Sequence, residues 1–306
     1  MLKPLVTIVL PVYNGEKTIK ATLESLLNQT FTNFEILIGI DGTMDQSKDI
    51  ALRFNDNRIK IIEHPENLGL ANNLNEIIKL ASPNSQYFAM AEQDDIYVLE
   101  RLQWQVEVME KQKDVGLVSG IAEFQNENGN LFFPGILVYK KQFPKRNEMF
   151  KYLYINQLKV VNTCMLWRKD IHCNNSLTFR NTYGNFNVDW DFILRFSLVK
   201  NIYGINKVLV KMNRKKTNYS VTSNRWQQYL ASRTLLKDFK EEFPYLVSDS
   251  TYTKALKTHC KIELGYYKKP ELFVRSLYYA LFFKDLYFLR YLRFSIKKAL
   301  AKALNF

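Results

Sequence analysis

The chain has 306 residues, a formal net charge of +13 and three cysteines. This length suits one catalytic domain with an appendage. The cysteines are odd in number and form no CxxC pair, so neither a disulfide framework nor a zinc site is expected. No apolar stretch approaches the roughly 20 residues that span a bilayer. Because Met1-Leu2-Lys3 leads directly into a strand-like run, we expect no signal peptide and a cytoplasmic protein.

The positive charge is concentrated in the second half. Residues 1–150 contain 15 Lys or Arg and 20 Asp or Glu, a net charge of −5. Residues 151–306 contain 28 and 10, a net charge of +18. The high pI and the many aromatic residues suggest a nucleic-acid-binding protein as one alternative. The acidic first half and the lack of an RNP-like or helix-turn-helix signature argue against it, so we expect no nucleic-acid partner.

The first third of the chain alternates between β-rich runs and amphipathic helical patterns. The expected strands are residues 5–10, 34–40, 58–63 and 87–92, and the expected helices are residues 16–29, 46–54, 70–80 and 99–113. Strict alternation of this kind implies βαβ units in an α/β fold with a mainly parallel sheet.

Polar and acidic residues follow three of these strands. Tyr13-Asn14 follows the first strand, Asp41 the second, and Glu92–Asp95 the fourth. In open α/β sheets, ligands bind at the carboxyl ends of the strands. We therefore expect these residues to lie on one rim and to form a site.

The stretch Glu92-Gln93-Asp94-Asp95 places three carboxylates among four residues. These charges would repel one another at neutral pH unless a cation lay between them or water solvated them. A divalent cation with oxygen ligands is what an enzyme acting on a nucleoside diphosphate needs. The alternative is a solvated acidic turn in which Asp94 or Asp95 is the N-cap of the helix of residues 99–113.

Five blocks in this order resemble the family-2 glycosyltransferases. They are residues 5–14, 28–35, 41–45, 67–71 and 92–97. Five ordered blocks at family spacing are a specific signal. The resemblance covers the first third closely and extends more loosely to about residue 215. It implies an inverting, metal-dependent enzyme with a GT-A fold, a Rossmann-like, mainly parallel sheet flanked by helices, that uses a nucleotide-sugar donor.

The resemblance also implies roles for individual residues. Asp41 would recognise the base, usually uracil, and Pro11 and Tyr13 would frame it. Asp94 takes the metal-ligand position with Glu92 and Asp95 beside it, and Mn²⁺ or Mg²⁺ is the expected cofactor. The complete expected donor site is Pro11, Tyr13, Asn14, Asp41, Asn67, Gln93 and Asp94.

Three positions depart from the family pattern. Ile40 stands where many members have an aspartate, and Leu74 where an arginine is common. Glu92 replaces the commoner aspartate and is longer by one methylene. These changes bear on which nucleotide the donor carries, and they leave the expected donor chemistry in place.

Inverting transfer also needs a general base for the acceptor hydroxyl. The stretch Asn187–Arg195 resembles the family's acidic pair, with Val188 in place of the usual glutamate. Asp189 then holds the catalytic-base position, and Asp191 is the second candidate. The alternative is that Asp189 caps a helix N-terminus, and both can be true. Trp190 could stack on a sugar or simply pack.

A basic cluster follows in the second half. Lys207, Lys211 and Arg214–Lys216 could bind donor or acceptor phosphates. In relatives a histidine metal ligand often precedes an Asn-x-Ser stretch like Asn218–Ser220. No histidine stands there in this chain, so that ligand is lost or replaced.

From about Asn224 the pattern becomes helical, over residues 226–239, 252–267, 272–283 and 286–304. The last of these has a basic side (Arg290, Arg293, Lys297 and Lys298) and an apolar stripe (Leu289, Leu292, Ile296, Leu300 and Ala303). This helix suits either an anionic membrane surface or packing on the domain.

We therefore expect a catalytic domain at residues 1–220 and a basic helical extension at residues 221–306. Within the domain, residues 1–115 would bind the nucleotide sugar and residues 116–220 the acceptor. The expected reaction moves a sugar from a donor, UDP-linked by resemblance, to a glycan on a polyprenyl diphosphate, for capsule, O-antigen or another envelope glycan. The location would be the cytoplasm or the inner face of the plasma membrane. A nucleotidyltransferase is the remaining alternative, but it would normally show a Gly-rich loop where this chain has Pro11–Asn14.

Overall fold

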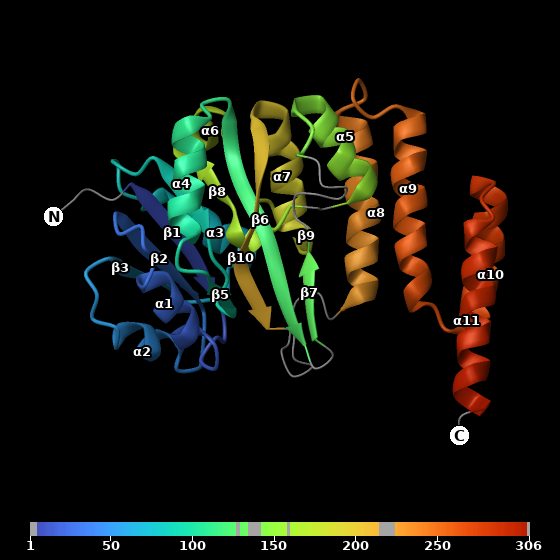
Figure 1. The fold of residues 1–306 in the computed structure, drawn as a ribbon, viewed down its shortest axis with the longest axis horizontal. Helices are drawn as coiled ribbons and strands as arrows, with labels where there is room; N and C mark the ends of the chain where they lie inside the picture. Colours follow the sequence, from blue (N-terminus) through green and yellow to red (C-terminus); the bar gives the residue numbers. More distant parts are fainter. Residues whose placement is uncertain (1–4, 127–128, 134–141, 158–159, 214–223, 305–306) are drawn as a thin grey trace. The chain divides into compact units, whose positions relative to one another are not determined.

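The computed structural model describes residues 5–126, 129–133, 142–157, 160–213 and 224–304 (Figure 1). The chain forms two compact units. Unit 1 comprises Met1–Tyr154 and Leu158–Asn224, and unit 2 comprises Ile155–Gln157 and Arg225–Phe306.

Unit 1 is built on a sheet with the strand order β3-β2-β1-β4-β8-β6-β10-β5, and β7 pairs with β6. The strands of unit 1 are β1 Val6–Val12, β2 Phe34–Asp41, β3 Ile59–His64, β4 Tyr87–Met90, β5 Asp95–Tyr97, β6 Val115–Asn126, β7 Gly129–Phe133, β8 Leu166–Arg168, β9 Thr182–Asn185 and β10 Asn201–Asn213. The pairs β1–β2, β1–β4, β2–β3 and β6–β10 are parallel, whereas β5, β7 and β8 run antiparallel to their partners.

Helices connect the parallel strands. They are α1 Ile19–Leu27, α2 Ser47–Leu52, α3 Leu70–Lys79, α4 Arg101–Lys111, α5 Arg146–Asn156, α6 Lys169–Asn174 and α7 Val188–Val199, with a 3-10 turn, η1, at Asn162–Cys164. The predicted α/β class with a mainly parallel sheet is confirmed. All four predicted strands and four predicted helices of the first third are present, with bounds shifted by a few residues.

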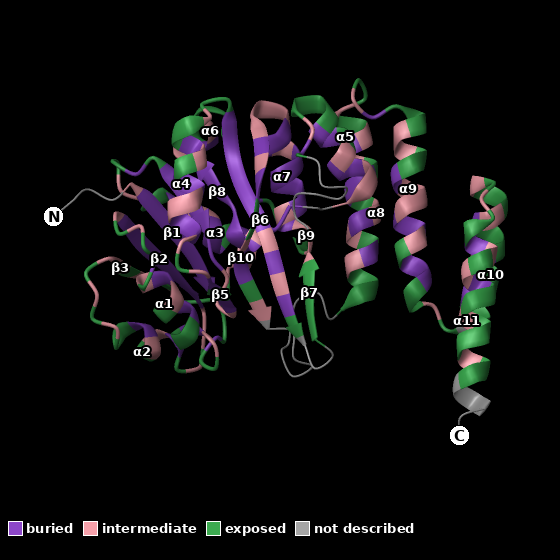
Figure 2. Cartoon of the chain, viewed as in Figure 1, coloured by how far each residue is buried: buried purple, intermediate pink, exposed green. Residues whose placement is uncertain are grey.

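The core lies on both faces of the central strands. Every residue of β1 and β2 is buried, as expected for near-continuous apolar strands covered by helices on both sides. Figure 2 shows these strands in purple on the left-hand side of the view. Leu23 and Leu26 of α1 join Ile8 and Ile36 in the main hydrophobic cluster. The polar residues of the predicted site therefore lie at the ends of these buried strands.

The helix cap considered as an alternative for the acidic stretch is wrong. Asp94 and Asp95 do not cap α4, because α4 begins at Arg101 after Glu100. The short strand β5 intervenes and pairs with β10, Asp95 opposite Met212 and Tyr97 opposite Val210. This pairing joins residues more than 100 positions apart, which local sequence patterns do not encode.

Unit 2 contains all four expected helices: α8 Arg225–Glu242, α9 Asp249–Glu263, α10 Lys269–Phe283 and α11 Tyr287–Leu304, with a 3-10 turn, η3, at Leu264–Tyr266. A small core joins α9, η3, α10 and α11 through Cys260, Leu264, Leu272, Tyr279, Phe288 and Leu292. Among the described helices, none combines the length and the apolar character needed to cross a bilayer.

The apolar stripe predicted on α11 divides in two. Leu292 is buried and Leu289 is partly buried, so the first half of the stripe packs within unit 2. Ile296 and Leu300 are exposed, so the second half does not. The side chain of Ala303 lies outside the described residues.

Candidate active site

The ends of β1, β2 and β4 form one rim, as the sequence predicted. Strand β1 lies between the other two, with Val12 opposite Ile40 and Val9 opposite Met90. Hydrogen bonds then join the turns that follow. The Asn14 backbone N–H donates to Oγ1 of Thr43, at 2.6 Å. The residues after the three strands are therefore physically linked.

Gln93 ties the acidic stretch to the first turn. Its Oε1 accepts the Tyr13 N–H at 2.8 Å, and its Nε2 donates to the Tyr13 carbonyl at 2.9 Å. A Cβ on Gly15 would stand 2.6 Å from Gln93 Oε1, so a larger residue at this position would displace the Gln93 amide. The Tyr13 side chain is 50% exposed on the rim, whereas Pro11 is buried at the end of β1.

Asp41 is nearly inaccessible and braces the turn before α3. Its carboxylate oxygens accept the N–H groups of Leu68 and Gly69 at 2.7 and 3.1 Å. Asn67, which is exposed, accepts the Gly69 N–H through its own Oδ1 at 3.0 Å. Asp41 therefore positions this turn, a role that the sequence did not reveal, in addition to any contact with a base.

The three carboxylates of Glu92, Asp94 and Asp95 converge, and one oxygen of each lies within 4.8 Å of the others. Burial raises the pKa of Glu92 well above its usual range, and the charges of Asp95, Asp94 and Asp189 add to this. Burial also raises the pKa of Asp94. Crowded carboxylate oxygens fit a hard divalent cation, so this cluster could hold Mn²⁺ or Mg²⁺.

The hydroxyl groups of Thr163 and Tyr97 connect Asp95 and Glu92 through hydrogen bonds. Thr163 donates to Asp95 at 2.5 Å, so its only proton is used there. The Tyr97 hydroxyl, 2.8 Å from Thr163, must therefore donate to Thr163 while it accepts the Glu92 backbone N–H at 2.7 Å. Asn162 donates to Glu92 Oε1 at 2.8 Å. Asn162 and Thr163 lie in η1, and nothing in their local sequence signalled this contact.

A buried arginine, Arg101, lies close to Tyr97 and Asp95. The guanidinium of Arg101 stacks over the Tyr97 ring at 4.3 Å and donates to the Met90 carbonyl at 2.6 Å. Burial lowers the pKa of Arg101, and the nearby Tyr97, Cys164 and Asp95 oppose that shift. Its positive charge partly balances the acidic cluster.

Asp189 belongs to α7. Its charge is among the causes that raise the pKa of Glu92, after burial and the charges of Asp95 and Asp94. Asp189 is in the first turn of α7, and the N-cap is Asn187, so Asp189 is not the cap itself. Its Oδ1 accepts the Trp190 N–H at 2.9 Å, and burial raises the pKa of Asp189.

Asp191 is in a different environment. It is 1% exposed, and its two oxygens accept from Arg195 Nε at 3.2 and 3.1 Å. The indole of Trp190 is buried, so it packs in the core and has no free face for a sugar. The contacts thus separate the two candidate bases: the charge of Asp189 acts on Glu92, and Asp191 is held in an internal ion pair with Arg195.

The loop before α7 explains how the second half of the chain reaches the rim. Asn75 of α3 holds the Phe179 backbone with two hydrogen bonds, at 2.8 and 3.0 Å. Further along, Asn185 Oδ1 accepts the Leu70 N–H at 3.1 Å, beside Gly69. These contacts lay the loop against the turn that Asp41 braces. Leu74, where an arginine is common in relatives, is fully buried and cannot contact a donor.

The basic cluster is only partly described. The Lys207 ammonium lies 3.8 Å from the centre of the Trp104 ring, so it packs on α4. Lys211 is exposed on β10. The predicted phosphate contacts of Arg214–Lys216 and the Asn218–Ser220 stretch lie outside the described residues.

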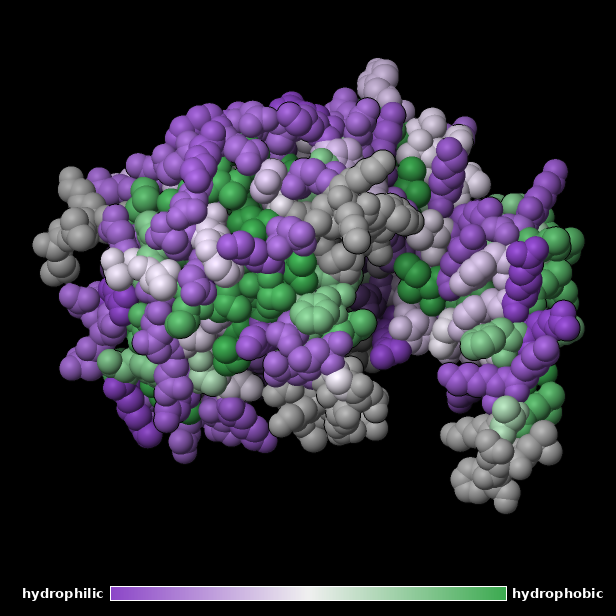
Figure 3. Space-filling model, viewed as in Figure 1, coloured by the Kyte–Doolittle hydropathy of each residue, from purple (hydrophilic) through white to green (hydrophobic). Residues whose placement is uncertain are grey.

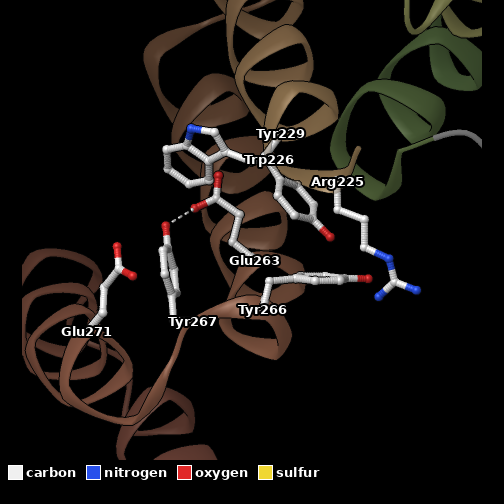
Figure 4. A pocket seen from close by; sticks show the side chains of 7 residues that line it. All are labelled: Arg225, Trp226, Tyr229, Glu263, Tyr266, Tyr267 and Glu271. Atoms are coloured by element: carbon white, nitrogen blue, oxygen red, sulfur yellow. Dashed lines mark hydrogen bonds between the residues drawn. The ribbon is translucent and has the colours of Figure 1, made fainter. Parts of the chain in front are cut away.

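A separate hollow of about 380 Å³ lies within unit 2, where α8, α9, η3 and α10 meet (Figure 4). It is lined by Arg225, Trp226, Tyr229, Glu263, Tyr266, Tyr267 and Glu271. Figure 4 shows Tyr267 donating to Glu263, and Arg233 and Tyr279 also donate to that carboxylate. Since Glu263 is saturated by internal partners, we assign it to the support of the helices.

A mainly parallel, Rossmann-like sheet with an acidic cluster on its carboxyl rim is the arrangement expected of a GT-A glycosyltransferase. Residues 7–173 match the sequence profile described as Glycosyl transferase family 2. The chain belongs to this family.

The comparisons with individual proteins agree. The chain is 29% identical over 242 residues to the Escherichia coli UDP-Glc:alpha-D-GlcNAc-diphosphoundecaprenol beta-1,3-glucosyltransferase WfgD. The aligned region covers 78% of this chain and 87% of WfgD. The crystal structure of S. aureus TarS 1-349 in complex with UDP-GlcNAc is similar in fold, with a TM-score of 0.61, 15% identity and coverage of 96% and 92%. Mannosyltransferase PcManGT from Pyrobaculum calidifontis in complex with GDP-Man and Mn²⁺ has a TM-score of 0.57, 14% identity and coverage of 95% and 84%.

Proposed function

We propose that this glycosyltransferase transfers a sugar from a UDP-sugar to a lipid-linked glycan acceptor, with inversion at the anomeric carbon. The observation that carries the proposal is the convergence of the carboxylates of Glu92, Asp94 and Asp95, with the charge of Asp189 acting on Glu92. An inverting enzyme needs a group for the leaving diphosphate and a separate base for the acceptor hydroxyl. These residues supply both, from different elements of unit 1.

Each residue has a distinct task in this proposal. Asp94 would hold the divalent ion, with Glu92 and Asp95 beside it. The bound ion supplies positive charge next to the diphosphate. Asp189 would accept the proton of the acceptor hydroxyl as that oxygen attacks, and the burial that raises its pKa makes it a stronger base.

The donor would lie along the rim between the first turn and the Asp41 turn. Tyr13 offers an exposed ring for the base, and Asn14, Asn67 and Gln93 offer polar groups around it. Asp41 keeps Leu68 and Gly69 in position for this contact. We assign the donor to residues 1–115, the acceptor to residues 116–220, and an accessory role to residues 221–306.

The donor and acceptor classes rest on relatives. WfgD acts on UDP-Glc and a GlcNAc-diphosphoundecaprenol, and TarS was crystallised with UDP-GlcNAc. A UDP-sugar and a glycan on a polyprenyl diphosphate are therefore the first choices for this chain, in the synthesis of a capsule, O-antigen or other envelope glycan. Such an acceptor would bring the enzyme to the inner face of the plasma membrane as a peripheral protein.

A panel of nucleotide sugars tests the proposal. Thermal unfolding is measured with each donor, in Mn²⁺ and in EDTA, and a ligand at 100 times its Kd should stabilise the folded state by about 2.7 kcal/mol. We expect UDP-sugars to stabilise the protein only with the metal. The anomeric configuration of the product, read by NMR, should be opposite to that of the donor. Retention, or formation of a nucleotide sugar from a nucleoside triphosphate, would refute the proposal.

A further inference from the structure

One face of α10 is apolar and open to solvent. The helix buries Leu272, Ser276 and Tyr279 on one side. The opposite side exposes Phe273, Val274, Leu277, Tyr278, Leu281 and Phe282. Because these six follow a spacing of i, i+1, i+4, i+5, they form one continuous strip along the helix. Leu281 is 79% exposed, which shows how little of the strip is covered within the described residues.

Basic residues of α11 lie on the same hairpin. Arg290, Arg293, Lys297 and Lys298 are all exposed, and the exposed Phe294 lies among them. Residues 268–304 contain nine Lys or Arg and two Asp or Glu. Figure 3 shows green hydrophobic side chains along the right-hand edge of this hairpin, next to purple hydrophilic ones. We call the exposed strip of α10 and the basic side of α11 the hairpin surface.

The hairpin is attached to α9 through its turn. Asp285 accepts from Lys257 and Lys261 of α9, at 2.7 and 3.0 Å. It also accepts the Tyr287 N–H at 2.9 Å, which starts α11. Its negative charge is therefore compensated inside unit 2, and the basic side of α11 keeps its net positive charge.

A shallow hollow borders the α10 strip. Val274 and Tyr278 of the strip line it together with Arg275 and Arg233. Arg233 is committed to Glu263, and the guanidinium of Arg275 lies over the face of Tyr267, at 5.5 Å. A guanidinium at the edge of an apolar strip is suited to a phosphate group.

We propose that the hairpin surface docks on an anionic lipid membrane. The apolar strip of α10 would lie in the plane of the bilayer at the boundary of headgroups and acyl chains, with the basic residues on lipid phosphates. The helix has 15 residues, which is about 22 Å, too short for a hydrocarbon core of about 30 Å. This surface differs from the one the sequence indicated, because α10 carries the apolar contact and α11 mainly the charge.

Charge favours a membrane over a second copy of the chain. Two copies of this surface facing each other would bring like charges together, whereas anionic headgroups complement them. The inference rests on the proposed function, since it names the surface through which the enzyme would bind the membrane as a peripheral protein. Its test needs no nucleotide sugar, so the two can fail independently.

Co-sedimentation with vesicles tests the docking. The full chain is mixed with vesicles of phosphatidylglycerol and phosphatidylcholine, or of phosphatidylcholine alone, at low and high salt. We expect binding to the anionic vesicles that weakens at least tenfold in high salt. Replacing Leu281 and Phe282 together by Glu should weaken it at least tenfold. The control is Leu80→Glu, at an exposed leucine in unit 1.

A second variant separates charge from apolar contact. Arg290→Gln with Arg293→Gln and Lys297→Gln should weaken anionic binding and remove most of its salt dependence. Negligible binding of the full chain to both vesicle types would overturn the proposal, and so would equal binding of the Leu281 and Phe282 variant. The surface would instead be assigned to a second copy of the chain under two conditions. Light scattering would show a dimer that the Leu281 and Phe282 variant dissociates, and no binding to vesicles would be seen.

Discussion

The side-chain amide of Gln93 and the backbone of Tyr13 form a two-bond contact, at 2.8 and 2.9 Å, between the segments that follow the paired strands β4 and β1. The contact uses both groups of the amide and both polar groups of the Tyr13 backbone. It fixes the acidic cluster and the first turn in one geometry. A donor that touches both turns would therefore meet a preorganised site.

Gly15 makes this contact possible, which leads to the first prediction. In Gly15→Ala, the new Cβ would displace the Gln93 amide and break the contact with Tyr13. We expect donor affinity to fall by roughly 1–2 kcal/mol, as for one or two lost hydrogen bonds. In a Gln93→Ala background the same change should cost much less, since the obstacle is gone.

Titration of UDP-sugar into the four proteins of this cycle measures the coupling. Gly265→Ala is the control, because its Cβ would meet only Tyr291 Oη at 3.6 Å. Strictly additive effects of the two changes would contradict the assigned contact.

Asp94 carries the second prediction. Asp94→Ala should abolish metal-dependent donor binding and leave the melting temperature unchanged or slightly higher, because the charge of Asp94 helps to raise the pKa of Glu92. Removing a like charge relieves repulsion in a protein without the ion. Calorimetry with Mn²⁺ and UDP measures the loss, with Asp170→Ala, an exposed residue of α6, as control. Wild-type binding by Asp94→Ala would remove this residue from the site.

The alternation of strands and helices was predictable because each element has a clear local period, and the rim followed from the rule for parallel sheets. The contacts of Asn162 and Thr163 were not, since η1 reaches Glu92 and Asp95 only through the order of β4, β8 and β6. The exposed strip of α10 was also missed. Its sequence is apolar nearly all round and reads as a buried helix.

The third prediction separates the two aspartates of α7. Asp189→Asn keeps the size of the side chain but removes its basicity, so turnover should fall by roughly 10²-fold or more with donor affinity unchanged. Asp191→Asn instead removes the carboxylate with which the largely buried Arg195 forms an ion pair. We expect this variant to lose about 3 kcal/mol of stability.

Turnover with a glycan acceptor, donor Kd and urea unfolding of both variants test this division. The assignment of the base would pass to Asp191 if Asp189→Asn kept its turnover while Asp191→Asn, still folded, lost it.

Glu263 gives the fourth prediction, which concerns acid stability of unit 2. This carboxylate is 1% exposed. Burial alone would raise its pKa, but the hydrogen bonds from His259 and Arg233 outweigh burial and lower the pKa of Glu263 to about 2. As pH falls, the unfolded chain therefore takes up this proton before the folded chain does. The stabilisation is complete above about pH 4.5 and is lost as the pH falls from there to about 2.

Urea unfolding followed by the helical circular dichroism signal measures this effect at pH 7, 4 and 3. The shift from 4.5 to about 2 corresponds to at most about 3 kcal/mol at pH 7. We expect Glu263→Gln to unfold at lower urea than wild type at pH 7, because Arg233 loses its charge partner, and the difference should shrink steadily toward pH 3. The control is Glu271→Gln, an exposed carboxylate at the edge of the same hollow, which should unfold like wild type throughout. A Glu263→Gln variant whose deficit stays constant from pH 7 to pH 3 would show that the charge of Glu263 does not stabilise unit 2.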